Sequence, residues 1–189
     1  MKEALLAIGL AAAVAVRAQE PGLGLSFSPE SEKFAEATKE YQGIWDSEGR
    51  KMIEAMESVS GMKFAEREVA VIVFEGVSRS GSKGSPMKLR ASYPAAVKKA
   101  TLIHELGHRL NARLANRPEG VDEHKVLFLY LYDVWAKLYG RAFADEQVAV
   151  EKKRKGVYDY ETAWDWALSL GQEGRASLLR QIVKENAPG

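Results

Sequence analysis

Apolar side chains recur at three-, four- and seven-residue intervals along much of the chain, which is the pattern of amphipathic helices. The first such stretch follows Ser28-Pro29-Glu30, a helix-start signal made of an N-cap serine, a proline in the first turn and an acid. Its apolar positions are Phe34, Tyr41, Ile44, Trp45, Met52, Met56 and Val59. The pattern predicts one long helix, or two end to end with a bend near Gly43 or Gly49, ending at Ser60-Gly61.

The period then changes from helical to extended. Residues 68–74 (EVAVIVF) are rich in β-branched side chains and predict a buried strand. A Gly- and Ser-rich stretch at 75–85 predicts a mobile surface loop. Residues 86–93 (PMKLRASY) alternate apolar and polar side chains, which predicts a half-exposed edge strand whose backbone is free to pair with an extended peptide.

Helical spacing returns after Pro94 and continues through Leu114, with a break at 116–120 (NRPEG). A second helix over 121–138 is apolar most of the way round, so we expect it to be buried. Further helices are predicted over 142–155, 158–168 and 176–183, where they cap the core. The pattern as a whole predicts an α+β fold, mostly helical, with a small sheet.

The helix after Pro94 contains the sequence His104-Glu105-Leu106-Gly107-His108. Residues four apart lie on the same face of a helix, so His104 and His108 can direct imidazole nitrogens at one cation. Glu105 lies beside them, within reach of a water held at that cation. This is the arrangement of a zinc hydrolase, and it predicts a helix with one Zn²⁺ ion and Glu105 as general base.

A catalytic zinc site usually has three protein ligands and one open position. The remaining histidine, His124, lies at the predicted start of the helix over 121–138, where it can face the first helix. We expect His124 to be the third ligand. Glu123 is the main alternative, because a carboxylate also binds zinc, and Glu119 is a more remote one. For the hydrogen bond to the substrate oxyanion, the sequence offers Tyr93, Tyr158, Tyr160 and Arg90 without choosing among them.

Two polar features of the helical half also need an interpretation. Asp133 lies in an apolar run and needs a partner: it either accepts the second ring N–H of a zinc-bound histidine or pairs with an arginine. The basic run Lys152-Lys153-Arg154-Lys155 ends a predicted helix, where cations offset the helix dipole and are usually solvated.

Composition narrows the chemistry further. The 189 residues include no cysteine, which excludes disulfides, a thiolate zinc ribbon and a cysteine nucleophile. The apolar run from Ala4 to Val16, with small residues up to Ala18, predicts a signal peptide over residues 1–18 and a periplasmic or secreted location; without such a signal the protein is cytoplasmic. Removing residues 1–18 leaves 25 basic and 25 acidic side chains, so no nucleic-acid partner is expected. We expect a single domain over 19–189, with a helical region at 28–60, a core at 68–139 and C-terminal helices at 141–189.

A His-Glu-x-x-His helix preceded by strands resembles the zincin metallopeptidases, in which the helix lies under a sheet whose edge strand aligns the substrate. The metzincin continuation is absent after His108, and so is the second-helix Glu-x-x-x-Asp of thermolysin-like enzymes, since Leu127 follows four residues after Glu123. The spacing to His124 is most similar to the SprT-like arrangement. The resemblance covers about residues 68–139. It implies a zincin-like fold and a zinc metallopeptidase that binds a peptide or protein along the 86–92 strand.

A non-catalytic function is the alternative. The chain would then be a secreted binding or scaffold domain in which a metal, if one is bound, is structural.

Overall fold

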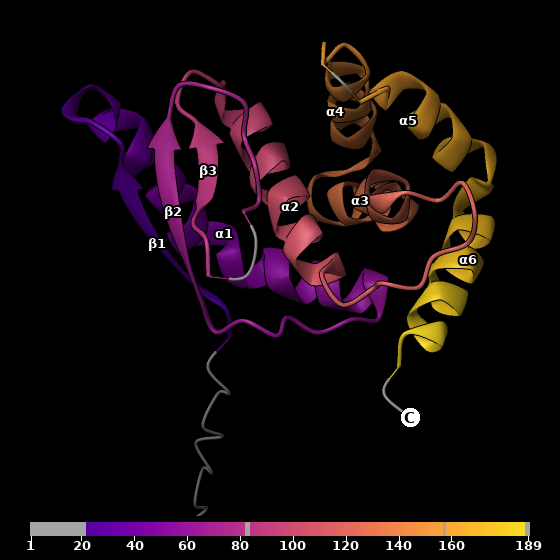
Figure 1. Ribbon diagram of the computed structural model, residues 1–189. Coiled ribbons are helices and arrows are strands. Elements are labelled where there is room, and N and C mark those ends of the chain that lie inside the picture. Colours follow the sequence, from indigo (N-terminus) through magenta and orange to yellow (C-terminus); the bar gives the residue numbers. More distant parts are fainter. Residues whose placement is uncertain (1–21, 82–83, 157, 188–189) are drawn as a thin grey trace, which may run out of the picture.

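Three strands, six α-helices and one 3-10 turn lie within residues 22–81, 84–156 and 158–187, which the computed structural model describes. In chain order they are β1 (Gly24–Pro29), η1 (Glu32–Phe34), α1 (Ala35–Ser60), β2 (Glu68–Phe74), β3 (Met87–Arg90), α2 (Ala95–Asn111), α3 (Glu123–Tyr139), α4 (Arg141–Lys152), α5 (Tyr160–Ser169) and α6 (Gly171–Glu185). The sheet lies on one side of α2, and α3 to α6 lie on the other (Figure 1). The predicted α+β class, mostly helical with a small sheet beside the His-Glu-x-x-His helix, is confirmed.

The sheet is parallel, in the order β1-β2-β3. Alternate side chains of β2 (Val69, Val71, Val73) and β3 (Met87, Leu89) are buried, as expected for strands with one face on the core. The strand β2 begins and ends where the sequence predicts. β1 was not predicted, because its short GLSFSP sequence carries few β-branched side chains.

The outer edge of β3 is already paired. The chain leaves β2, passes along the outside of β3 and then returns to form β3 itself. On the way, Arg79 and Lys88 exchange two backbone hydrogen bonds of 2.9 Å in an antiparallel bridge, and the Arg90 N–H donates to Oγ of Ser78 at 3.0 Å. The prediction of an unpaired edge on residues 86–92 is therefore wrong, because the predicted surface loop lies along it. We call residues 78–80 the edge segment.

The helix α1 is a single element of 26 residues, without a break at Gly43 or Gly49. It begins at Ala35, well after Pro29, because Ser28-Pro29 ends β1 and does not cap a helix. Gly61, in the left-handed region with a φ of 74°, ends it as predicted. The helix packs against β1, α2 and α3.

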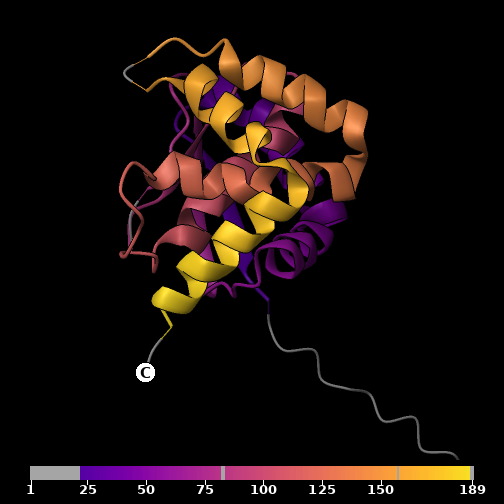
Figure 2. The ribbon, with the colours of Figure 1, turned by 90° about the vertical axis from the view of Figure 1, so that its right-hand side faces the viewer.

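The helix α3 is the centre of the helical half. As its apolar sequence predicts, it is buried, and it packs against α1, α2, α4, α5 and α6. Figure 2 shows α6 running across the outer side of this half. No helix among the described residues is both long and apolar enough to cross a bilayer. The predicted signal peptide, residues 1–18, lies outside the described residues.

Gly107 allows α2 and α3 to approach each other closely. A β-carbon on Gly107 would lie 2.3 Å from Cδ1 of Leu127 and 3.1 Å from the hydroxyl oxygen of Tyr130. Leu127 and Tyr130 are fully buried, and the Tyr130 hydroxyl donates to the Gly107 carbonyl at 3.1 Å. Neither side chain has room to move, so any side chain at 107 would separate the two helices.

The helix contact can be tested by substituting two glycines. Gly107→Ala should lower the melting temperature, because overpacking costs about 1–3 kcal/mol and exceeds the roughly 1 kcal/mol gained in helix propensity. Gly43→Ala is the matched control: that glycine is exposed on α1, and a β-carbon added there would have no atom within 4 Å, so its replacement should raise the melting temperature. Equal upward shifts in both variants would contradict a tight contact at Gly107.

Candidate metal centre

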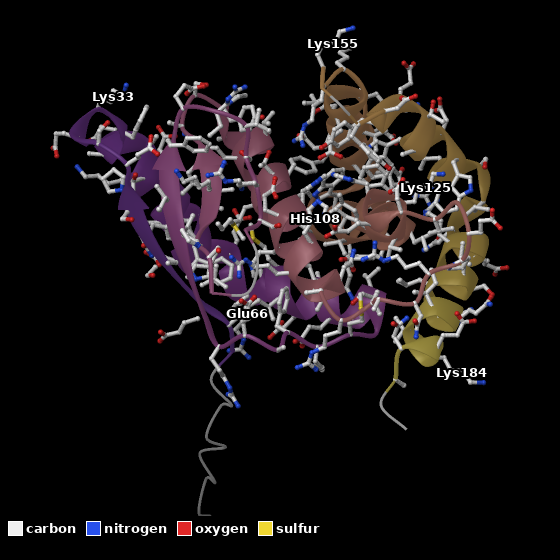
Figure 3. All side chains as sticks on the ribbon, viewed as in Figure 1. Lys33, Glu66, His108, Lys125, Lys155 and Lys184 are labelled. Atoms are coloured by element: carbon white, nitrogen blue, oxygen red, sulfur yellow. The ribbon has the colours of Figure 1, made fainter. Side chains whose placement is uncertain are left out.

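The two histidines of α2 point toward the same place. Nε2 of His104 lies 3.2 Å from Nε2 of His108, one turn further along the helix. The His104 side chain is buried and that of His108 is partly exposed. Figure 3 shows His108 on the side of α2 that is turned toward α3.

The third histidine comes from the start of α3. His124 is the second residue of that helix, and the helix is capped by Asp122, whose Oδ1 accepts the Lys125 N–H at 2.9 Å. The His124 ring centroid lies 5.6 Å from that of His104 and 4.7 Å from that of His108. One ligand nitrogen from each of the three rings lies within 4.8 Å of the others, so the cluster could hold a metal ion.

The donor set fits a small divalent ion. At metal–nitrogen distances of about 2.0–2.1 Å, two ligands of a tetrahedral ion are about 3.3–3.4 Å apart, close to the separation between His104 and His108. Burial, followed by the charges of His104 and His108, lowers the pKa of His124 to about 3. At neutral pH the His124 ring is therefore uncharged and has a lone pair to offer.

A carboxylate lies against the far nitrogen of each α2 histidine. Nδ1 of His104 is 2.7 Å from Oε1 of Glu151, a short contact without the directed geometry of a hydrogen bond. Nδ1 of His108 is 2.9 Å from Oε1 of Glu123. Such contacts fix the ring orientation and leave Nε2 for a metal.

Glu123 therefore has a different place from the one that the sequence suggests. Its carboxylate contacts the outer nitrogen of His108, and the three histidines group together without it. The hydrogen bond from His108 lowers its pKa, in spite of partial burial. Glu123 therefore lies against a histidine of the cluster from outside, and the third member of the cluster is His124.

Glu151 is a buried carboxylate beside the cluster that the sequence did not reveal. It lies on the buried face of α4 with Ala144 and Val148, at the spacing of an apolar stripe. Its Oε2 accepts the Trp164 Nε1–H at 2.9 Å, and Arg154 lies 3.4 Å from Oε1. Burial alone would raise its pKa, but the charges of His104 and Arg154 hold that pKa well below its ordinary value. A charged carboxylate therefore stands behind His104.

Asp133 and Arg154 both have charged partners within the fold. Asp133 pairs with Arg175 of α6 through contacts of 2.9–3.2 Å, so of the two partners considered, the arginine is the one present. Arg154 does not extend into solvent with its basic neighbours. Its guanidinium turns inward over the Tyr160 ring, 5.6 Å from the centroid, and Lys152 pairs with Asp165.

Glu105 is almost fully buried, with 4% of its surface exposed. Burial raises the pKa of its carboxyl above the ordinary value, although the charges of His104, His108 and Arg154 oppose that shift. A carboxylate with a raised pKa next to a metal cluster accepts a proton more readily than a solvated one does.

Arg109 connects this helix to the edge segment. Its Nε donates to the carbonyl of Ser80 at 2.9 Å and its Nη2 to that of Ser85 at 2.6 Å, while Nη1 pairs with Glu66 at 2.7 Å. The arginine next to His108 thus fixes the edge segment relative to the cluster. The sequence did not single out Arg109.

Comparison of the chain with protein-family models, with curated proteins and with solved structures gives no match.

The supporting role of Glu151 can be measured through metal affinity. Glu151→Gln should weaken Zn²⁺ binding by about 10–100-fold, because a neutral amide orients His104 less firmly and leaves Arg154 without its charged partner. Glu123→Gln, at a half-exposed position, should have a smaller effect. Glu146→Gln, on the exposed face of the same helix as Glu151, serves as control. Competition with a chromophoric chelator measures all three, and an affinity of Glu151→Gln equal to that of the control would contradict the role.

Proposed function

We propose that the protein is a zinc-dependent metallopeptidase. The observation that carries this proposal is the convergence of His104, His108 and His124, together with the buried carboxylate of Glu105, on which the charges of His104 and His108 act. Three neutral ligands leave a zinc ion one open position, and a general base lies at its side. The resemblance of the His-Glu-x-x-His helix and its preceding strands to zincins supports the same function.

Zinc is the ion that suits these donors best. Three imidazoles in a chain without cysteine favour a borderline ion over calcium or magnesium, which prefer oxygen ligands. The three histidines would hold it, and Glu151 and Glu123 would orient two of them. When bound, the ion supplies a Lewis acid that polarises the substrate carbonyl and lowers the pKa of water toward 7.

Glu105 carries the proton in the reaction. As the oxygen of a water molecule bonds to the carbonyl carbon, Glu105 takes a proton from that water. The carbon–nitrogen bond then breaks, and Glu105 delivers the proton to the leaving nitrogen, which departs as an amine. The products are one carboxylic acid and one amine, and Glu105 returns to its charged form. Its raised pKa suits both the uptake and the release of the proton.

An extended peptide substrate would lie along the edge segment. Because Arg79 uses its backbone N–H and C=O toward Lys88, the backbone groups of its neighbours Ser78 and Ser80 face the opposite way. Arg109 already holds the Ser80 carbonyl, which leaves Ser78 to receive the peptide backbone. The substrate is thus aligned by residues 78–80 and not by β3 directly.

Metal binding by three histidines predicts a specific thermal response. Zn²⁺ at about 100 times its dissociation constant should stabilise the folded chain by about 2.7 kcal/mol and raise the melting temperature by roughly 5–10 °C. His124→Ala should lose most of this increase, because two histidines bind far more weakly than three. A melting temperature of His124→Ala that rises with Zn²⁺ as much as that of the wild type would exclude His124 as a ligand.

Replacement of the general base separates binding from hydrolysis. Glu105→Gln should retain Zn²⁺ affinity within about threefold and lose at least roughly 10²–10⁴-fold in kcat on a peptide library, because general base catalysis contributes about that much. Both quantities are measured on the same zinc-loaded protein. Cleavage that a chelator does not inhibit, or cleavage by Glu105→Gln as fast as by the wild type, would contradict a zinc-dependent peptidase with Glu105 as general base. Tight zinc binding by a wild type that cleaves nothing would favour a structural metal.

A further inference from the structure

Tyr160 is the aromatic residue that brings a hydroxyl group to the metal centre. Its oxygen lies 3.3 Å from Nε2 of His124, and the two ring centroids are 5.1 Å apart. The 3.3 Å separation is close to the 3.2 Å between the facing nitrogens of His104 and His108. The Tyr160 hydroxyl therefore lies on the border of the histidine cluster.

The position of Tyr160 is fixed from several sides. It is the first residue of α5, and the N-cap of that helix, Asp159, binds both the N–H and the hydroxyl of Thr162 at 3.0 and 2.7 Å. The Phe128 ring centroid lies 6.3 Å from the Tyr160 ring centroid, and the guanidinium carbon of Arg154 lies over the Tyr160 ring, 5.6 Å from its centroid. A ring held in this way directs its hydroxyl with little loss of entropy when a substrate binds.

Two of the other candidates for this role, Tyr158 and Arg90, are engaged elsewhere. The Tyr158 hydroxyl donates to the Asp122 carboxylate, with oxygen distances of 2.8 and 3.1 Å. Arg90 pairs with Glu75 at 3.0 Å and lies over the Tyr93 ring. Among the ring contacts of the described residues, Tyr93 has none with the three histidines.

We propose that Tyr160 is a catalytic residue that donates a hydrogen bond from its hydroxyl to the substrate carbonyl oxygen as that oxygen gains negative charge. The inference rests on the proposed peptidase function. In the structure this hydroxyl contacts Nε2 of His124. If that nitrogen gave its lone pair to zinc, the hydroxyl would be free to donate to the carbonyl oxygen instead. Arg154, paired with Glu151, lies over the phenol ring.

The alternative role for Tyr160 is to orient His124, and the two roles have opposite signatures. A donor to the oxyanion affects the transition state and leaves zinc affinity unchanged. A residue that only orients a ligand affects zinc affinity and leaves the turnover of each zinc-loaded molecule unchanged. Two measurements on the same protein, kcat for the zinc-loaded form and zinc affinity, therefore separate them.

The experiment compares zinc-loaded wild type with Tyr160→Phe and Tyr158→Phe. A phosphinic peptide, whose tetrahedral anionic phosphorus mimics the transition state, is titrated by calorimetry in addition to peptide hydrolysis. Tyr160→Phe should lose about 10²–10³-fold in kcat and bind the phosphinic peptide at least about 10-fold more weakly, with KM and zinc affinity within about threefold of wild type. Tyr158→Phe keeps the ring that stacks on His124, with centroids 4.2 Å apart, but loses the hydrogen bond to Asp122, the N-cap of the helix that carries His124. It should therefore weaken zinc binding and retain phosphinic-peptide affinity once zinc is loaded.

A third variant, Tyr132→Phe, loses a hydroxyl bonded to the exposed Asp145 and controls for removal of a tyrosine oxygen remote from the histidines. Phosphinic-peptide affinity and kcat in Tyr160→Phe equal to those of Tyr132→Phe would overturn the proposal. A fall in zinc affinity alone would also overturn it and assign the orienting role. Failure of the peptidase function has a distinct result, because the zinc-loaded wild type would then neither cleave peptides nor bind the phosphinic peptide.

Discussion

The close approach of α2 and α3 at Gly107 is the constraint on which the candidate site depends. His104 and His108 belong to one helix and His124 to the other, so the distance between the helices sets the distance between the ligands. Leu127 fills the space that a side chain at 107 would need, and the Tyr130 hydroxyl bonds both the Gly107 carbonyl and the Asn111 side chain. The contact that packs the core between α2 and α3 therefore also sets the geometry of the histidine cluster. The glycine at position 107 of the His-Glu-x-x-His motif is explained by Leu127 and Tyr130 of α3, which leave no room for a side chain there.

Around this contact the ionisable side chains are arranged in two layers. The inner layer consists of the three imidazoles and Glu105, all near the α2–α3 contact. Behind it lie Glu151 and Glu123: Glu151 is buried beside Trp164, and Glu123 is near solvent. A buried carboxylate is stable only with partners, and Glu151 has His104, Trp164 and Arg154. Four elements, α2, α3, α4 and α5, therefore contribute to the electrostatics of one cluster.

Much of the fold and the inner layer could be predicted from the sequence, because both follow local rules. The strand β2, the helical spacing and the His-Glu-x-x-His face need only periodicity and i, i+4 geometry. The placement of Glu151 requires knowing which face of α4 is buried, although a carboxylate aligned with Ala144 and Val148 was a usable signal. Arg154 was expected to be solvated because a basic run at a helix end usually is, and its inward turn depends on Glu151. The pairing of the β3 edge could not be predicted either, since a Gly- and Ser-rich segment has no pattern that favours a strand.

Residues of α4, of α5 and of the connection between them belong to the candidate site. The stretch compared with zincins ends near residue 139, yet Glu151 and Tyr160, which contact His104 and His124, lie beyond it. So do Trp164 and Arg154, which contact Glu151 in turn. The C-terminal helices are therefore part of the candidate site as well as a cover for the core. A related chain that kept the histidines but ended after α3 would have the three imidazoles of such a centre. It would lack the side chains of α4 and α5 that set the polarity around them.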